Sequence, residues 1–232
     1  MPRNLSSAEL GKMAGDIRRM RDRLDLMSAQ ARSELLARRA RESDGIDRPD
    51  QCDWAARPGP WMTEMRPRGI VGLASPQPLS GGITLFHDAT NADFSLVQDR
   101  VPVWVEGPQF GLVLEVYRSD GSFISFVQDL PAEALVGLTR NHFIALNLVA
   151  EREQPVEMYA RLNVQHGPNV EQIVRQVEFD GTDGRAEFDL AYSKINEKRL
   201  EKAWLDLIIE GPKMTRVALW DMVLLRAPRA DF

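Results

Sequence analysis

The stretch "MYARLNVQHGPNVEQIVRQVEFD", residues 158–180, decides the fold, because it predicts two strands around a tight turn. Side chains alternate between the two faces of a strand, and in the first strand one face is apolar and the other polar. The apolar face carries Met158, Ala160, Leu162 and Val164. The polar face carries Tyr159, Arg161, Asn163 and Gln165. One buried and one wet face are typical of an antiparallel sheet.

The same period of two extends over the chain from residue 69 onward. Short apolar runs occur at 69–74, 83–87, 93–97, 101–106, 110–117, 122–128, 142–150, 156–165, 170–179, 186–192, 203–210 and 216–226. Gly, Pro, Asn or Asp separates most of them. This pattern predicts an antiparallel, jelly-roll-like β-sandwich over 69–232, with short helical breaks at 131–138 and from Ser193 to 203. The expected core is Leu112, Leu114, Ile144, Leu146, Leu148, Leu162, Leu205, Leu207, Ile209 and Trp220.

Residues 1–42 predict one amphipathic helix before the sandwich, since proline is absent from about Ser6 to Glu42 and good helix formers predominate. Ser6 or Ser7 caps its start, with Glu9 in the first turn. A seam of apolar residues follows the 3-4 spacing of a coiled coil. It consists of Leu10, Met13, Ile17, Met20, Leu24, Met27 and Ala31. The seam either packs on the chain's own sandwich or joins copies into a homo-oligomer, and both readings stay open.

Residues 43–68 read as a connector, because five acidic residues, four prolines and two glycines disfavour regular structure. Trp54 and Trp61 flank the segment "RPGP" at 57–60. Exposed tryptophans in a linker are unfavourable, so both are expected to pin the connector onto the sandwich.

The charge distribution separates the helix from the rest of the chain. The 232 residues have a net charge of -5, but residues 1–42 hold ten basic and six acidic side chains, which leaves the remainder at -9. A body this acidic argues against nucleic acid as the main ligand. Cys52 is the only cysteine, so no internal disulfide forms. Neither a signal peptide nor an apolar run of about 20 residues is found, which favours a cytoplasmic protein without a membrane span.

Five segments carry a family resemblance: "FHDAT" (86–90), "SDGSFISFVQDLP" (119–131), "ARLNVQHGPN" (160–169), "FDLAYSKINEKRLEKAWLDLIIEGPKM" (188–214) and "RAPRADF" (226–232). They resemble an uncharacterised family of alphaproteobacterial proteins. The ending "AWLDLIIEGPKMTRVALWDMVLLRAPR" (203–229) is also loosely similar to the last two strands of galactose-binding-like carbohydrate-binding modules. That second resemblance implies a saccharide-binding β-sandwich.

The search for catalytic or metal-binding motifs gives no complete set. His87, His142 and His166 form no metal-binding pair, Cys52 has no histidine near it in sequence, and phosphate-binding loops are absent. No cofactor is expected. Glu187 and Asp189 share one strand face at about 6–7 Å, which suits a glycosidase pair. Their segment resembles the ExDxxE strand of laminarinase-like hydrolases, but Tyr192 replaces the third carboxylate. A glycoside hydrolase-like activity is therefore the least favoured reading.

The polar face of 158–165 favours a non-enzymatic glycan-binding module. Aromatic rings suit the apolar side of a sugar, and amide and guanidinium groups suit its hydroxyls. Trp104 with Glu106, and Trp204 with Asp206, repeat the same combination. The expected ligand-binding residues are Tyr159, Arg161, Asn163, Gln165, Trp104, Trp204 and Asp206. The alternative is a structural or assembly protein that docks to another protein. Asp221 interrupts an apolar strand and is expected to pair with Arg226 or Arg161.

Overall fold

The computed structural model describes the backbone of residues 6–42 and 44–229, and their side chains except at 25, 26 and 29–42. The chain forms two compact units, Met1–Glu42 and Ser43–Phe232, and each is described by itself. Within the described ranges, no helix combines the length and apolarity that crossing a membrane requires.

The first unit is one helix, α1, from Ser7 to Glu42. Its predicted cap forms: the Ser6 backbone N–H donates to Glu9 Oε2 at 2.8 Å, and the Glu9 N–H donates to Ser6 Oγ at 3.3 Å. The seam side chains from Leu10 to Met27 are between 48% and 64% exposed. The side chain of Ala31, the last seam position, lies outside the described residues. Association through the seam stays a prediction.

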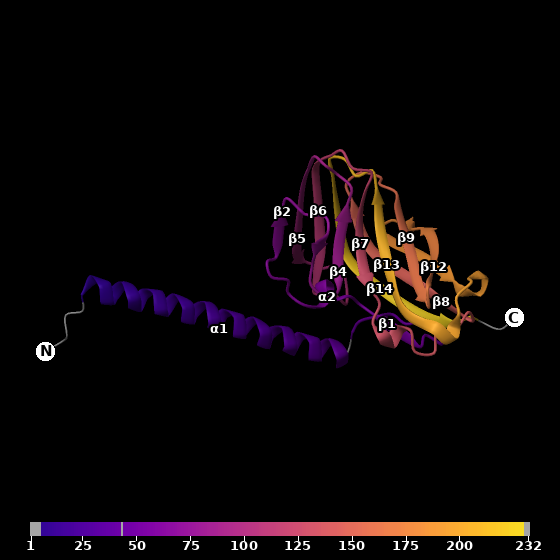
Figure 1. Ribbon diagram of the computed structural model, residues 1–232, viewed down its shortest axis with the longest axis horizontal. Coiled ribbons are helices and arrows are strands. Elements are labelled where there is room, and N and C mark those ends of the chain that lie inside the picture. Colours follow the sequence, from indigo (N-terminus) through magenta and orange to yellow (C-terminus); the bar gives the residue numbers. More distant parts are fainter. Residues whose placement is uncertain (1–5, 43, 230–232) are drawn as a thin grey trace. The chain divides into compact units, whose positions relative to one another are not determined.

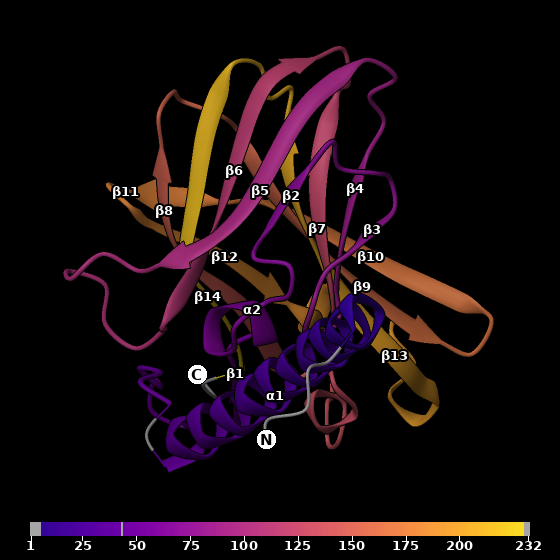
Figure 2. The same cartoon turned by 90° about the vertical axis from the view of Figure 1, so that its left-hand side faces the viewer.

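The second unit is the predicted antiparallel β-sandwich (Figure 1). Sheet A has the order β11-β12-β8-β14-β6-β5-β2, with β1 beside β14, and sheet B has the order β10-β9-β13-β7-β4-β3. Figure 2 shows the two sheets from a second direction. The strands are β1 Trp54–Ala56, β2 Gly69–Val71, β3 Gln77–Pro78, β4 Ile83–His87, β5 Ala92–Arg100, β6 Phe110–Ser119, β7 Phe123–Asp129, β8 His142–Arg152, β9 Met158–His166, β10 Asn169–Gln176, β11 Glu178–Asp180, β12 Asp183–Asp189, β13 Leu200–Glu210 and β14 Thr215–Pro228.

The last two strands in chain order each occupy the centre of one sheet. β13 pairs with β7 and β9 in sheet B, while β14 pairs with β6 and β8 in sheet A. The short connection at 211–214 joins the two strands, which lie in different sheets and form no ladder with each other, so this β-arch crosses the sandwich from sheet to sheet (Figure 1, yellow). Its alternating apolar side chains, among them Leu205, Leu207 and Ile209, are fully buried between the sheets.

All ten side chains of the expected core are buried. Nine of them lie in the main cluster between the sheets, but Trp220 belongs to a second, smaller cluster with Val105, Val113 and Ala218. A register shift between Leu219 and Asp221 leaves Trp220 unpaired in the β14–β8 ladder, as in a β-bulge. Gly111 makes room for the indole, because a Cβ there would lie 2.6 Å from Trp220 Cε3.

The connector is more ordered than its composition suggests. β1 pairs with β14, and a short helix, α2, spans Gly59–Met62. Trp61 is fully buried, and its indole N–H donates to the Leu219 carbonyl at 2.9 Å, while Trp54 is half-buried against the core. Both tryptophans therefore anchor the connector as expected. The expectation of irregular structure was wrong for β1, because backbone pairing with β14 outweighs local propensity. It was also wrong for α2, where the buried, hydrogen-bonded Trp61 holds the helical turn in place.

Two predicted elements and one predicted ion pair are wrong. Residues 101–106 form a loop, and β13 begins at Leu200 where a helix from Ser193 was expected. Within the predicted helix, residues 193–199 form one 3₁₀ turn, Glu197–Arg199, which Asn196 caps. Asp221 pairs with Arg57 of the connector, at 2.7 and 2.9 Å, and not with Arg226 or Arg161. Arg226 instead binds Asp53, at 2.8 and 2.9 Å.

Two exposed loops at one end of the sandwich are joined by reciprocal carboxylate contacts. Asp88 accepts hydrogen bonds from the hydroxyl and backbone N–H of Ser122, and Asp120 accepts from the backbone N–H groups of Thr90 and Asn91 and from the Thr90 hydroxyl. These donors lower the pKa of both carboxyl groups below the ordinary value of 3.8.

We expect these carboxylates to make the sandwich less stable in acid. A depressed folded pKa gives a contribution that is present above the ordinary value of 3.8 and is lost as the pH falls through the folded pKa. The Asp88→Asn, Asp120→Asn double variant should show a smaller loss of urea-unfolding midpoint between about pH 5 and pH 3 than the parent chain. Equal losses in both proteins would show that other carboxyl groups control the acid response.

Candidate functional site

The outer face of sheet B carries most of the predicted site. Arg161 on β9 lies opposite Asp206 on β13, and Asn163 lies opposite Trp204. On the far side of β9, β10 places Gln172 opposite Asn163. The neighbouring β7 places Val127 opposite Asp206. Because the intervening residues of β9 and β13 point into the core, these side chains share one outward surface.

A connected set of polar groups occupies the middle of this face. We call Arg161, Asn163, Gln172 and Asp206 the Arg161 network. Arg161 Nε donates to Asp206 Oδ2 at 2.6 Å, and its Nη2 lies 2.5 Å from the same oxygen. Asn163 Nδ2 lies 3.3 Å from Asp206 Oδ2, and Gln172 Nε2 donates to Asn163 Oδ1 at 2.8 Å. The network therefore links three adjacent strands.

Burial within the Arg161 network is uneven. Asn163 is fully buried and Asp206 is 2% exposed, although both lie on the outer side of the sheet. The Arg161 side chain is 40% exposed. A buried carboxylate is stable only with hydrogen-bond and charge partners, which Arg161 and Asn163 supply here. In return, Asp206 fixes the plane of the guanidinium. Among the described residues nothing hydrogen-bonds to Arg161 Nη1.

Aromatic side chains flank the network on two strands. Trp204 is half-buried beside Asn163, and the Lys202 ammonium group lies 4.8 Å from the centre of its ring. Tyr159 is half-buried two residues before Arg161, and its hydroxyl donates to Glu157 Oε2 at 2.6 Å. This hydrogen bond raises the pKa of Tyr159. Lys202 occupies one side of the Trp204 ring, so a ligand that stacks on that side has to displace it.

The two remaining predicted ligand-binding residues, Gln165 and Trp104, lie outside the Arg161 network. Gln165 lies near one end of β9 and donates to Glu201 Oε2 at 2.8 Å. Trp104 lies in the loop between β5 and β6 of sheet A, is 49% exposed, and does not join the Arg161 network. Sequence alternation suggested a strand there, but the loop instead packs Val105 against Trp220.

Both carboxylates of the predicted pair on β12, Glu187 and Asp189, are bound by nearby protein groups. Glu187 forms a surface ion pair with Arg185, and both side chains are about half exposed. Asp189 accepts a hydrogen bond from the Ala191 N–H at 2.9 Å, as the cap of a 3₁₀ turn at Leu190–Tyr192. It also lies 3.5 Å from Arg229. In the described part of the chain, no group of three or more His, Cys, Asp or Glu side chains is placed to hold a metal ion.

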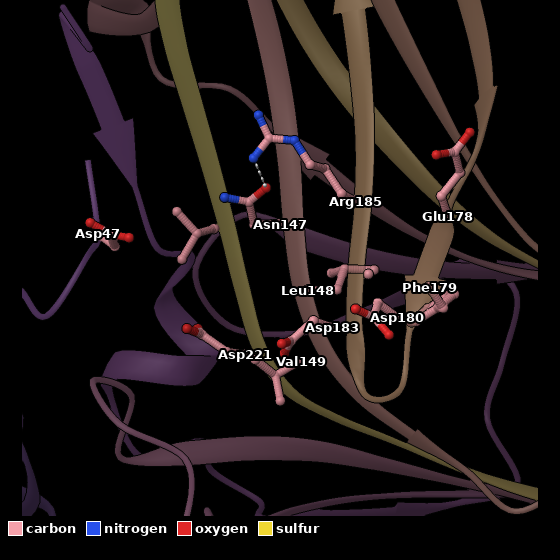
Figure 3. Close-up of a pocket in the computed structure, with 12 residues that line it drawn as sticks. Asp47, Asn147, Leu148, Val149, Glu178, Phe179, Asp180, Asp183, Arg185 and Asp221 are labelled. Atoms are coloured by element: carbon pink, nitrogen blue, oxygen red, sulfur yellow. Dashed lines mark hydrogen bonds between the residues drawn. The ribbon is translucent and has the colours of Figure 1, made fainter. Parts of the chain in front are cut away.

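A concave region lies on the outer face of sheet A (Figure 3). We call it the acidic hollow. It measures about 630 Å³, and Asp47, Asn147, Leu148, Val149, Glu178, Phe179, Asp180, Asp183, Gly184, Arg185, Asp221 and Val223 line it. Arg185 points across it to Asn147 Oδ1 at 3.4 Å. Its lining has five carboxylates against one arginine, and that arginine already pairs with Glu187. The hollow is therefore unsuited to anionic ligands.

Comparison with known families places the chain. A family model described as a family of unknown function, DUF6478, matches residues 1–232. The chain belongs to this family. The predicted kinship with an uncharacterised family is thereby confirmed, while the alphaproteobacterial source stays a prediction. No curated protein matches this DUF6478 sequence.

Solved structures similar to this DUF6478 chain include carbohydrate-binding modules. The family 11 module from Clostridium thermocellum, in complex with a mixed-linked tetrasaccharide, has a TM-score of 0.42 and 11% identity and covers 70% of this chain and 98% of its own. A module named TmCBM61, in complex with a β-1,4-galactotriose, has a TM-score of 0.38 and 11% identity and covers 62% and 88%.

A phage protein is similar at the same level. The enzymatically active domain of tailspike protein 4 from bacteriophage CBA120 has a TM-score of 0.41 and 11% identity and covers 62% of this chain. The DUF6478 chain spans only 19% of that domain. With TM-scores below 0.5, these similarities assign no ligand to the DUF6478 chain.

Proposed function

We propose that this chain is a non-enzymatic glycan-binding β-sandwich that holds saccharides on the outer face of sheet B. The Arg161 network carries the proposal, because it fixes a half-exposed guanidinium in the middle of an outward-facing sheet. Holding a donor in place before the ligand arrives lowers the entropy lost on binding. Hydroxyl groups of a sugar accept hydrogen bonds from such a donor.

The surroundings of Arg161 suit the apolar side of a sugar ring. Trp204 lies diagonally across from Arg161 on β13, and Tyr159 is its neighbour on the same face of β9. Val127 and Ile208 add half-buried aliphatic surface on β7 and β13. Because Asp206 neutralises Arg161, the face has no free positive charge at its centre, which favours neutral over acidic saccharides. A shallow, wet face binds weakly.

The test must remove ligand contacts without leaving Asp206 unpaired. Arg161→Ala is unsuitable alone, since Asp206 is 2% exposed and would lose its cation. Arg161→Lys keeps the charge but removes the planar set of donors, and Tyr159→Ala removes the flanking ring. We expect the full chain to bind a neutral saccharide on a glycan array, and the double variant to bind about tenfold more weakly.

Tyr117→Ala is the matched control, because Tyr117 is a 60%-exposed tyrosine on β6 of the opposite sheet. The affinity of Tyr117→Ala for the saccharide should equal that of the parent chain. To test for enzymatic activity, the parent chain is incubated with the oligosaccharide, and mass spectrometry should recover the oligosaccharide uncleaved. A parent chain that binds no saccharide, or equal losses in both variants, would reject the assignment of this face.

The second candidate is a protein-docking role for the same sheet. Val170 and Val174 on the edge strand β10 are 45% and 49% exposed. They stand on the same outer side as Gln172, so they extend the apolar surface beyond the Arg161 network. The double variant Val170→Ser, Val174→Ser should bind a protein partner more weakly, but its affinity for a neutral saccharide should be unchanged.

A further inference from the structure

The helix α1 presents an apolar seam with the spacing of a coiled coil. Leu10, Ile17 and Leu24 fall at the a positions of a heptad, and Met13, Met20 and Met27 fall at the d positions. All six are between 48% and 64% exposed, which is unusual for large apolar side chains that recur on one stripe. The seam thus has the form of one half of a helix pair.

Charges beside the seam show which partner fits. Asp16 and Arg23 occupy g positions, and Arg21 occupies an e position. In a parallel pair of identical helices, g of one copy faces the following e of the other, so Asp16 meets Arg21. In an antiparallel pair with layers Leu10–Met27, Met13–Leu24 and Ile17–Met20, g faces g, so Asp16 meets Arg23. Both arrangements join opposite charges twice.

Asp16 is free to change partners. In α1 it pairs with Arg19, three residues along the same helix, at 2.5 Å. That pair is on the surface, with 54% of the Asp16 side chain and 73% of the Arg19 side chain exposed. Exposed pairs of this kind are weak. Asp16 already lies beside the seam, so exchanging Arg19 for an arginine of a second helix loses little stability in α1.

We propose that α1 pairs with α1 of a second copy of this chain, and that Asp16 fixes the alignment through an arginine of that copy. The pairing is independent of the proposed glycan binding. The helix pairing predicts that reversing the charge at position 16 weakens the dimer. It also predicts that reversing the charge of one arginine on the partner helix restores the dimer.

Charge reversal in the full chain tests the proposal. Sedimentation equilibrium should show a dimer for the parent chain, and Asp16→Arg should raise its dissociation constant about tenfold. Adding Arg21→Asp to Asp16→Arg should restore the dimer if the helices are parallel, and adding Arg23→Asp should restore it if they are antiparallel. Asp22→Arg is the matched control, because position 22 is an f position on the side opposite the seam.

The outcomes separate clearly. Rescue by one arginine reversal and not the other supports the proposal and gives the helix orientation. A parent chain that is monomeric at tens of micromolar overturns it. Equal weakening by Asp16→Arg and Asp22→Arg, or rescue by neither reversal, removes Asp16 from the interface. Circular dichroism of each variant checks that α1 remains helical, so loss of the dimer cannot be mistaken for loss of the helix.

Discussion

Replacing Arg57 with alanine is expected to lower the free energy of unfolding of the sandwich by about 3–5 kcal/mol. Arg57 and Asp221 are 164 residues apart in sequence and form a buried ion pair with two hydrogen bonds. Their side chains are 2% and 11% exposed. Removing only the arginine leaves a buried carboxylate without its charge partner. The arginine also binds the Asp44 and Gly45 carbonyl groups, so the start of the connector loses its attachment as well.

Two controls make this experiment specific. Arg185→Ala removes the cation of a half-exposed pair with Glu187 and should change stability by about 0–1 kcal/mol. Arg57→Met combined with Asp221→Leu removes both charges and should recover most of the loss. Urea unfolding followed by tryptophan fluorescence measures all three. If Arg57→Ala and Arg185→Ala shift the midpoint equally, the buried pair is not the attachment that we infer.

Replacing Gly81 with alanine is expected to destabilise the sandwich by about 2–4 kcal/mol. Gly81 has φ +67°, and a Cβ there would lie 2.6 Å from Gly59 Cα and 2.8 Å from Gly59 N. The two backbones would have to separate, and Gly59 begins the short helix that holds Trp61 in its buried site. Thermal unfolding by circular dichroism measures the effect.

Gly137→Ala is the matched control for this second prediction. Gly137 has φ +75°, but nothing lies within 4 Å of a Cβ built on it. It should show only the cost of the left-handed backbone conformation, about 1–2 kcal/mol. The difference between the two variants isolates the close contact of Gly81 with Gly59. Equal shifts in melting temperature would mean that this contact is not needed for stability.

Alternation and turn residues predicted the sandwich well because both are local signals. The run at 83–87 coincides with β4, and the strand at 156–165 is β9 to within two residues. The failures occur where distant parts of the chain override local preference. Residues 197–202 contain good helix formers, yet β13 begins at Leu200 because Ala203, Leu205 and the alternate residues after them fill the core. The apolar run at 101–106 resembled a strand, but it is a loop in which Val105 is apolar because it packs against Trp220.

The candidate site shows the same limit. Period two placed Tyr159, Arg161, Asn163 and Gln165 on one side of β9, and the structure agrees in direction. Sequence did not show that Asp206 would face Arg161, since the register between β9 and β13 depends on the whole sheet. The sequence therefore did not predict that Asn163 and Asp206 are buried. It also did not predict that Gln172 donates a hydrogen bond to Asn163. The only local signal was an acidic residue, Asp206, inside the otherwise apolar run at 203–209.

The central places of β13 and β14 in their sheets have a consequence for biosynthesis. Until residues 200–228 have left the ribosome, β6 and β8 lack the strand that lies between them, and β7 and β9 lack theirs. Until then the backbone N–H and C=O groups along one edge of each of these earlier strands are unpaired. The nascent chain therefore depends on rapid synthesis of the last strands or on chaperones to avoid aggregation. Arrested chains that end before Thr215 should therefore stay sensitive to protease, and protection should arrive late and all at once.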